Sequence, residues 1–231
     1  MKPVIVTGPA RADLSIVDDL AGYGVATVHE ALGRSGLLGP RLRPIQHGTR
    51  IGGTAVTALC WPGDNLMIHA AVEQCGEGDI LVVTTTSPST DGLFGELFAT
   101  ALRYRGVRGL VINAGVRDVA DLRALGFPVW SAAISAQGSV KATAGAVNVP
   151  VVLGGHIVRP GDAILADDDG VLCVPRDSVD VALSASKARL DKEAASREAF
   201  ANGELGLDRY GLRRKLEELG VRYVTAEEYA R

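Results

Sequence analysis

The chain has 231 residues, with 24 Lys and Arg against 27 Asp and Glu, so its net charge at neutral pH is −3. A balance so close to neutral leaves no basic surface for sequence-independent binding of nucleic acid, and we expect no nucleic-acid partner. No window contains the roughly eighteen apolar residues that a membrane-spanning helix needs, so we expect no membrane partner either.

The three cysteines, Cys60, Cys75 and Cys173, are widely spaced and lie in apolar runs. They match neither a disulfide framework nor a zinc site, so we expect them in the hydrophobic core. The first residues, MKPVIVTGPARADL, contain no apolar stretch of the kind found in a secretion signal. We therefore expect the protein in the reducing cytoplasm.

Composition separates a body from a tail. Residues 187–231 hold 19 of the 51 charged residues, more than twice the density of the preceding part. The body is rich in Gly and poor in aromatic residues, which is typical of α/β architecture. We expect an α/β body over residues 1–186 and a charged helical C-terminal extension over residues 187–231.

The first half of the body alternates helical and strand-like segments. Residues 16–34 predict one or two helices, and a strand over 54–60 follows a stretch rich in Gly and Pro. We expect Asp64 to cap a helix that continues to Cys75. The near-continuous β-branched run at 79–86 predicts a strand buried on both faces.

The alternation continues as far as residue 134. It predicts a helix over about 95–105, a strand over 106–113, a helix over 118–125 and a strand over 128–134. This β-α-β-α-β order predicts parallel strands joined by right-handed crossovers.

After residue 138 the helices stop, and short strands and turns predict antiparallel strands beside or over the parallel ones. A long helix is then expected over about 177–201, ending at Gly203. A last helix is expected over about 208–219, ending at Gly220.

Two predicted helix starts follow the carboxyl ends of parallel strands, where such sheets usually bind ligands. SPSTDGLFGELF brings Glu96 and the free amides of Leu97 and Phe98, whereas NAGVRD brings Arg117 and Asp118. Neighbouring parallel strands that end together would place these groups around one cleft. An Arg beside free amides suits a substrate carboxylate, and two carboxylates suit a hydrated cation such as Mg²⁺.

The same residues also have a purely structural interpretation. Asp118 is well placed to cap the helix that follows it, and Glu96 is a first-turn acid that the helix dipole favours. Arg117 would then pair with either acid at the surface. The residues alone favour this interpretation over a binding cleft.

A family resemblance reverses that preference. Glu96 is followed after twenty residues by Arg117 and Asp118, within GELFATALRYRGVRGLVINAGVRD. This spacing resembles the signature of the class II pyruvate aldolases that cleave 4-hydroxy-4-methyl-2-oxoglutarate and 4-carboxy-4-hydroxy-2-oxoadipate. These enzymes share a superfamily with shorter regulators of ribonuclease E activity. The similarity extends from about residue 16 to the C-terminus, and the tail segment GELGLDRY is more typical of the aldolase branch.

The resemblance implies a role for each matching residue. Asp118 would be the direct protein ligand of a divalent metal, Mg²⁺ or alternatively Mn²⁺ or Co²⁺, otherwise bound largely by water. Arg117 would contact the bound pyruvyl substrate and assist the chemistry at its oxygen atoms. Gly95 and the amides of Leu97 and Phe98 would hold the substrate carboxylate.

The resemblance also assigns two further acids. Glu96 stands where the family often has Asp, and it would position a water for proton transfer. Glu193 on the long helix would reach the site of a neighbouring subunit. Arg189, Glu193 and Arg197 also have the spacing of an ordinary ion-pair ladder on a helix surface.

The implied fold is a swivelling β/β/α domain with a C-terminal helical extension that packs on a neighbouring subunit, assembled as a homotrimer or hexamer. The implied activity is metal-dependent cleavage of a small 2-oxo acid substrate, a 4-hydroxy-2-oxo diacid, to pyruvate plus oxaloacetate or a second pyruvate. Oxaloacetate decarboxylation would be a side activity, and the usual pathway is aromatic catabolism through protocatechuate or gallate.

Two alternatives stay open. The chain could be a non-catalytic regulator of ribonuclease activity, or a dedicated oxaloacetate decarboxylase with the same site. The charged tail after residue 187 counts against the regulator, because those proteins resemble only the earlier part.

Other polar residues are expected to be structural. Asp167, Asp168 and Asp169 form an acidic turn typical of a solvated hairpin. His29 and His69 have no second His or Cys at ligand spacing, so packing or surface roles are expected. No lysine lies at either predicted helix start, so no Schiff base is expected.

Overall fold

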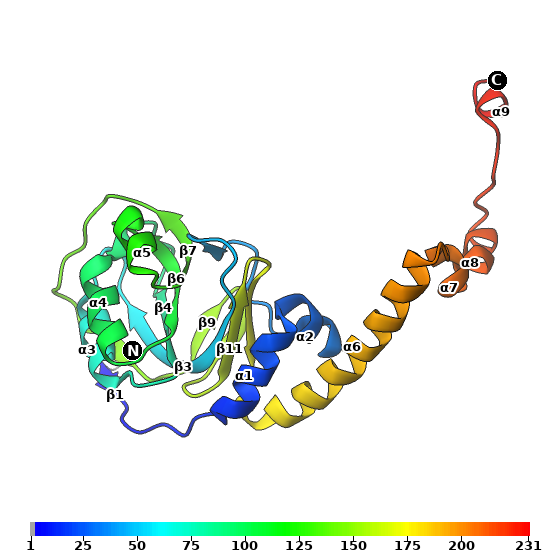
Figure 1. Cartoon of the computed structure of the whole chain (residues 1–231). Helices are drawn as coiled ribbons and strands as arrows, with labels where there is room; N and C mark the ends of the chain where they lie inside the picture. Colours follow the sequence, from blue (N-terminus) through cyan, green and yellow to red (C-terminus); the bar gives the residue numbers. More distant parts are fainter. Residues whose placement is uncertain (1–2) are drawn as a thin grey trace. The chain divides into compact units, whose positions relative to one another are not determined.

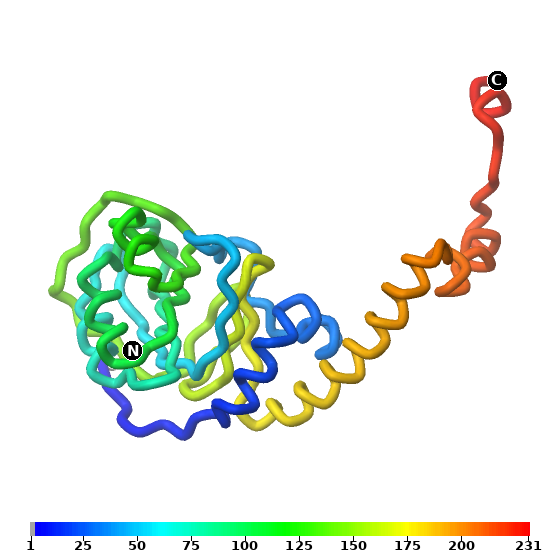
Figure 2. Tube along the Cα trace, viewed as in Figure 1, coloured from blue at the N-terminus to red at the C-terminus, as the bar shows by residue number. Residues whose placement is uncertain are grey.

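The structure is a computed structural model that describes residues 3–231 (Figure 1). Figure 2 traces the path of the chain. The chain divides into two compact units, Met1–Lys187 and Ala188–Arg231. Within the described residues, no helix combines the length and the apolar character needed to span a membrane.

The first unit is built around a sheet whose middle strands are parallel. These strands, in spatial order, are β3 (Ile51–Cys60), β4 (Asp79–Thr85), β6 (Gly109–Val116) and β7 (Val129–Ile134). Every neighbouring pair among them is parallel, which confirms the pairing predicted for residues 79–134. Short strands extend the sheet: β1 (Val4–Ile5), β2 (Arg43–Pro44), β5 (Gly92–Phe94) and β8 (Ala146–Val147).

Three helices cover one face of this sheet (Figure 1): α3 (Leu66–Gln74), α4 (Glu96–Tyr104) and α5 (Val119–Leu125). On β4, the alternate residues Leu81 and Val83 point to this face and pack with Ile68, Leu102 and Leu122 of the helices. Burial of these side chains holds the helix layer against the sheet.

The opposite face is covered by antiparallel strands: β9 (Val151–Leu153), β10 (His156–Val158), β11 (Ala163–Asp167) and β12 (Gly170–Val174). Ile80 and Val82 of β4 point to this side and pack with Val151, Ile164 and Val171. β11 also pairs antiparallel with the beginning of β3. The order of layers is therefore helices, parallel strands, antiparallel strands, as expected of a β/β/α domain.

Two N-terminal helices, α1 (Leu14–Tyr23) and α2 (Val25–Ala31), form a third core with β11 and β12. The break between them falls at Gly24, whose φ of 87° is left-handed and cannot continue a helix. Asp13 begins α1 by accepting a hydrogen bond from the Ser15 amide.

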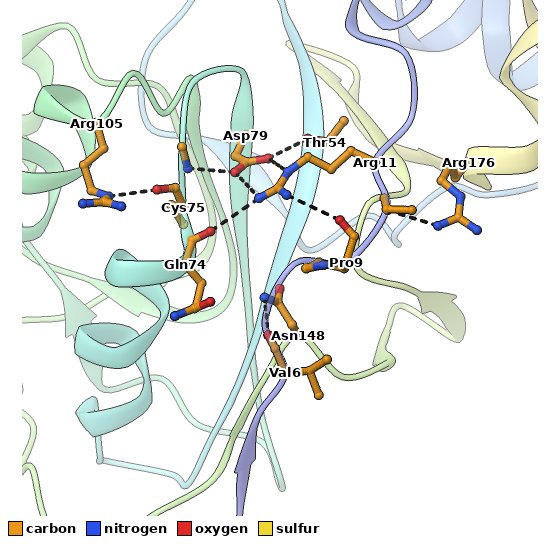
Figure 3. A network of polar contacts seen from close by, with 12 residues as sticks. Val6, Pro9, Arg11, Thr54, Gln74, Cys75, Asp79, Arg105, Asn148 and Arg176 are labelled. Atoms are coloured by element: carbon orange, nitrogen blue, oxygen red, sulfur yellow. Dashed lines mark hydrogen bonds and ion pairs between the residues drawn. The ribbon is translucent and has the colours of Figure 1, made fainter.

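A buried carboxylate anchors the segment before α1 to the sheet (Figure 3). Asp79 is inaccessible to solvent, and its two oxygens accept 2.8 Å hydrogen bonds from the Arg11 guanidinium. The Thr54 hydroxyl and the Gly76 amide donate to the same carboxylate, at 2.6 and 2.8 Å. The hydrogen bond to Asp79 raises the pKa of Arg11. A buried charge is tolerated here because each oxygen is paired.

The second unit is helical. After a short turn at Arg176–Ser178, the helix α6 (Val179–Ala201) contains the boundary between the units, and three short helices follow: α7 (Gly206–Arg209), α8 (Leu212–Glu218) and α9 (Ala226–Tyr229). The C-terminal helix is therefore present. The single helix expected over 208–219 is wrong, because Gly211 adopts a left-handed φ of 63° and separates α7 from α8.

Candidate functional site

A short strand brings the two predicted helix starts together. β5 is parallel to the end of β6, with Gly92 opposite Gly115 and Phe94 opposite Val116. The Arg117 amide then donates a 2.9 Å hydrogen bond to the Phe94 carbonyl. The residues just before α4 and just before α5 therefore lie side by side, as the pattern of strand ends predicted.

Asp118 bridges the two helix starts. Its backbone is left-handed, with φ 58° and ψ 37°, at the position preceding α5. Its side chain makes no capping hydrogen bond to α5; instead, Oδ2 accepts a 3.2 Å hydrogen bond from the Glu96 amide of α4. The purely structural interpretation of Asp118 as the cap of its own helix is therefore wrong.

Gly95 makes this contact possible. Its φ of −151° is extended and open to any residue, but a Cβ atom there would collide with Asp118 Oδ2 and approach Arg117 Cγ to 3.2 Å. Arg117 Nε lies 3.7 Å from Asp118 Oδ2, and the two side chains are 49% and 38% exposed. The carboxylate is thus oriented by neighbouring groups while part of it faces solvent.

A cavity of about 260 Å³ opens beside these groups. It is lined by residues of the first unit: Asn65, His69, Val72, Leu93, Gly95, Leu97, Phe98, Ala101, Arg117, Asp118 and Lys141. Five of the predicted site residues therefore line one cavity, close to the starts of α4 and α5.

Two predicted acids are placed differently. Glu96 is not among the residues that line the cavity; its Oε1 accepts a 2.6 Å hydrogen bond from the Thr100 hydroxyl one turn along α4. Glu193 lies on α6 in the second unit, where it forms a 2.8 Å ion pair with Arg189. Arg189 and Glu193 thus form one of the ion pairs that their spacing on the helix predicts. The catalytic roles of Glu96 and Glu193 stay predictions.

Sequence reasoning missed three polar residues of the cavity, Asn65, His69 and Lys141. The ring of His69 packs 4.4 Å from that of Phe98, so the expected packing role is present, but the side chain also lines the cavity. Burial lowers the pKa of His69, and the positive charge of Lys141 lowers it further. Lys141 comes from a loop without regular structure, which periodicity cannot detect.

Asp64 fixes the loop that carries Lys141. This buried carboxylate accepts hydrogen bonds from the amides of Leu66, Ala142 and Thr143, at 2.9, 2.9 and 2.7 Å. Burial acts to raise the pKa of Asp64, but the three amide donors outweigh it and hold that pKa below its usual value. The predicted cap is one residue off, because Asn65 occupies the N-cap position of α3, but the Asp64 side chain does accept a hydrogen bond from the first amide of that helix. The same side chain also holds the residues that follow Lys141.

Comparison with known proteins identifies the family to which the chain belongs. Residues 25–173, which include the whole lining of the cavity, match the family model RraA-like, described as Aldolase/RraA. The chain belongs to the RraA-like family. A protein of Halalkalibacterium halodurans is 25% identical over 201 residues, covering 87% of this chain and 96% of its own length. A protein of Burkholderia multivorans is 37% identical over 142 residues, covering 62% and 86%.

Both of these RraA-like relatives carry the name "Putative 4-hydroxy-4-methyl-2-oxoglutarate aldolase". Among solved structures, that of Streptomyces coelicolor RraAS2 has a TM-score of 0.73 and 28% identity, covering 82% of this chain and 99% of its own. It is described as an unusual member of the RNase ES inhibitor RraA protein family. Two of these relatives therefore carry an aldolase name, and the third is described as a member of an RNase inhibitor family.

Proposed function

We propose that this RraA-like protein is a divalent-metal-dependent aldolase that cleaves 4-hydroxy-2-oxo diacids. Suitable substrates are 4-hydroxy-4-methyl-2-oxoglutarate and 4-carboxy-4-hydroxy-2-oxoadipate, and the products are pyruvate plus pyruvate or oxaloacetate. The observation that carries the proposal is the cavity in which the first turn of α4, Arg117 and Asp118 meet. The names of the two aldolase relatives support the same reaction class.

The groups in the cavity fit a hydrated divalent cation. Asp118 supplies the carboxylate among the described lining residues, and no cluster of three or more His, Cys, Asp or Glu side chains occurs within residues 3–231. Mg²⁺ is commonly held through one or two carboxylates and keeps several waters, so a single partly exposed acid suits it. Bound by Asp118, such a cation would supply a Lewis acid for the negative charge that develops on the 2-oxo group.

The protein's own groups would orient the substrate. The amides of Leu97 and Phe98 lie in the first turn of α4, where backbone donors have no partner within the helix and the dipole favours an anion. They would hold the carboxylate of the pyruvyl half. Arg117, whose side chain is half exposed beside Asp118, would stabilise negative charge on the oxygen atoms of that half.

Glu96 would act through a water molecule. One of its oxygens accepts a hydrogen bond from Thr100, so the other is available to hold a water. That water would take the proton of the 4-hydroxyl group as the carbon–carbon bond breaks and would return a proton to the enolate carbon of pyruvate. We also propose that the protein assembles as a homotrimer or hexamer, in which Glu193 of the second unit would approach the site of a neighbouring copy.

Product analysis distinguishes this function from its alternatives. Purified protein with Mg²⁺ is given 4-hydroxy-4-methyl-2-oxoglutarate and, separately, oxaloacetate. An aldolase releases two pyruvates from the first compound, whereas a dedicated decarboxylase acts on oxaloacetate alone. A non-catalytic regulator is the second candidate function, because RraAS2 is described as a member of an inhibitor family. Such a regulator turns over neither compound.

A further inference from the structure

The cavity is also lined by polar side chains that the roles assigned above leave unused. We call Asn65, His69 and Lys141, which line the cavity together with Arg117 and Asp118, the Lys141 cluster. Building on the proposed function, we infer that Lys141 in this cluster binds the second carboxylate of the substrate. Lys141 then makes the enzyme selective for diacids over monoacids.

The charges in the cavity support a ligand with two negative groups. Arg117 and Lys141 are the cationic side chains among its described lining residues. Arg117 is next to the Asp118 carboxylate, at 3.7 Å, whereas no ion pair or hydrogen bond joins the Lys141 ammonium to another described side chain. A ligand carboxylate beside Lys141 would therefore accept a charge-assisted hydrogen bond from an ammonium group that has no acceptor among the described side chains.

Asn65 provides an independent sign of a polar ligand beside this cluster. The residue is only 7% exposed, and its Nδ2 donates a 3.0 Å hydrogen bond to the Leu93 carbonyl. Its Oδ1 is buried and has no hydrogen-bond partner within the described structure. A buried acceptor without a donor is unfavourable, so a ligand that brings a donor is stabilised there. The hydroxyl of a 4-hydroxy acid is such a donor, and it lies next to the second carboxylate in 4-hydroxy-4-methyl-2-oxoglutarate.

The backbone of the Lys141 cluster is held on both sides of Lys141. Before it, Val140 accepts a 3.0 Å hydrogen bond from the Asn65 amide and donates one of 2.8 Å to Gly63. After it, Ala142 donates to the Asp64 carboxylate. A side chain that emerges from a fixed backbone loses less entropy when it binds a ligand.

The neighbouring His69 does not compete with Lys141 for an anion. Burial and the charge of Lys141 both lower the pKa of His69, which favours its uncharged ring. Val72, Phe98 and Ala101 also line the cavity and give it an apolar surface. Among its lining residues, the cavity thus offers the Lys141 ammonium, the unpaired Asn65 acceptor and an apolar surface for the carbon atoms of a ligand.

The test compares two compounds that lack the hydroxyl and are not cleaved. Titration calorimetry with Mg²⁺ present measures the binding of 2-oxoglutarate and of 2-oxopentanoate, which differ by the second carboxylate. We expect the full chain to bind 2-oxoglutarate about tenfold or more tightly than 2-oxopentanoate, the gain typical of a hydrogen bond to a charged group. Lys141→Met removes this preference and Lys141→Arg retains most of it. Lys187→Met, at an exposed lysine that does not line the cavity, keeps it in full.

Equal affinity of the wild-type protein for the two compounds overturns the inference, as does an undiminished preference in Lys141→Met. Failure of the proposed function has a different signature. If the protein prefers diacids through Lys141 but cleaves no 4-hydroxy-2-oxo diacid, the diacid site is supported and the aldolase function is contradicted. If the protein cleaves both a diacid and 4-hydroxy-2-oxopentanoate, and Lys141→Met has the same selectivity as wild type, the aldolase function is supported and the role of Lys141 is contradicted.

Discussion

The Asp118 carboxylate accepts its hydrogen bond from the backbone amide of Glu96, the first residue of α4, and not from an amide of the helix that Asp118 itself precedes. The spacing seen in the sequence therefore corresponds to a direct contact between two helix starts. This contact orients one oxygen of the acid that we propose as the metal ligand. The chemistry of the site should consequently depend on how closely these two turns approach.

Gly95→Ala tests that approach. The added Cβ would collide with Asp118 Oδ2, so the carboxylate must move although the extended backbone accepts alanine. We expect aldolase activity to fall about 100-fold, because a displacement near 1 Å is enough for such a loss. The measurement is kcat/KM for pyruvate release.

The control for this variant is Gly22→Ala in α1, where the new methyl group would meet no atom within 4 Å. It should leave activity unchanged and raise the stability by about 0.5–1 kcal/mol, the helix propensity difference between the two residues. Normal activity in Gly95→Ala would show that the turns tolerate displacement.

Asp64 should make the stability depend on pH. Its pKa in the folded protein lies below its usual value of 3.8, so its contribution is complete above that pH and is lost as the pH falls through the lower, folded-state pKa. Asp64→Asn should cost about 1.5–3 kcal/mol at pH 7, the range for hydrogen bonds to a charged group.

Urea unfolding at several pH values measures this effect. The free energies of unfolding of Asp64→Asn and wild type should converge as the pH falls below about 4. A constant difference over that range would mean that the charge of Asp64 does not stabilise the loop that carries Lys141.

Arg11→Met should destabilise the first unit. The substitution leaves the fully buried Asp79 carboxylate without its cation, and removal of one partner from such a pair costs about 3 kcal/mol. Thermal or urea unfolding measures the loss. Arg34→Met breaks the exposed i,i+4 pair with Glu30 and should change stability by less than about 0.5 kcal/mol. Similar losses in the two variants would contradict the special role of the buried pair.

The layers of the fold could be predicted from hydrophobic pattern because the long elements have a clear period. Ile80 to Val83 is apolar at every position, since β4 is buried on both faces, and this was visible in the sequence. β5 has only three residues, with Gly92 among them, and its pairing with β6 is not a local property. Gly211 divides the last predicted helix because its φ is positive, although a glycine inside a helical pattern is often tolerated.

The candidate site was predicted in part for the same reasons. Arg117 and Asp118 follow a long parallel strand, so topology placed them at the sheet edge with the start of α4. Lys141 could not be found in this way, because it reaches the cavity through a loop whose position depends on Asp64, more than 70 residues away in sequence. The direction of the Glu96 side chain depends on its hydrogen bond with Thr100, which the helical pattern does not specify.

Assembly gives a separate prediction. If the protein is a homotrimer or hexamer with Glu193 acting across subunits, Glu193→Gln should lower kcat while leaving the mass measured by light scattering unchanged. Glu198→Gln, on the same helix α6, is the matched control and should change neither quantity. A fully active monomer would contradict the role proposed for Glu193.

The most direct test of the account measures pyruvate release from 4-carboxy-4-hydroxy-2-oxoadipate by the wild-type protein and by Asp118→Asn, before and after EDTA and with Mg²⁺ added back. Asparagine accepts the left-handed backbone of this position and keeps an oxygen for the Glu96 amide, so only the charge is lost. We predict that wild-type activity is abolished by EDTA and restored by Mg²⁺, and that the folded variant is inactive throughout. Activity that survives EDTA, or an active Asp118→Asn, would contradict a metal-dependent aldolase centred on Asp118.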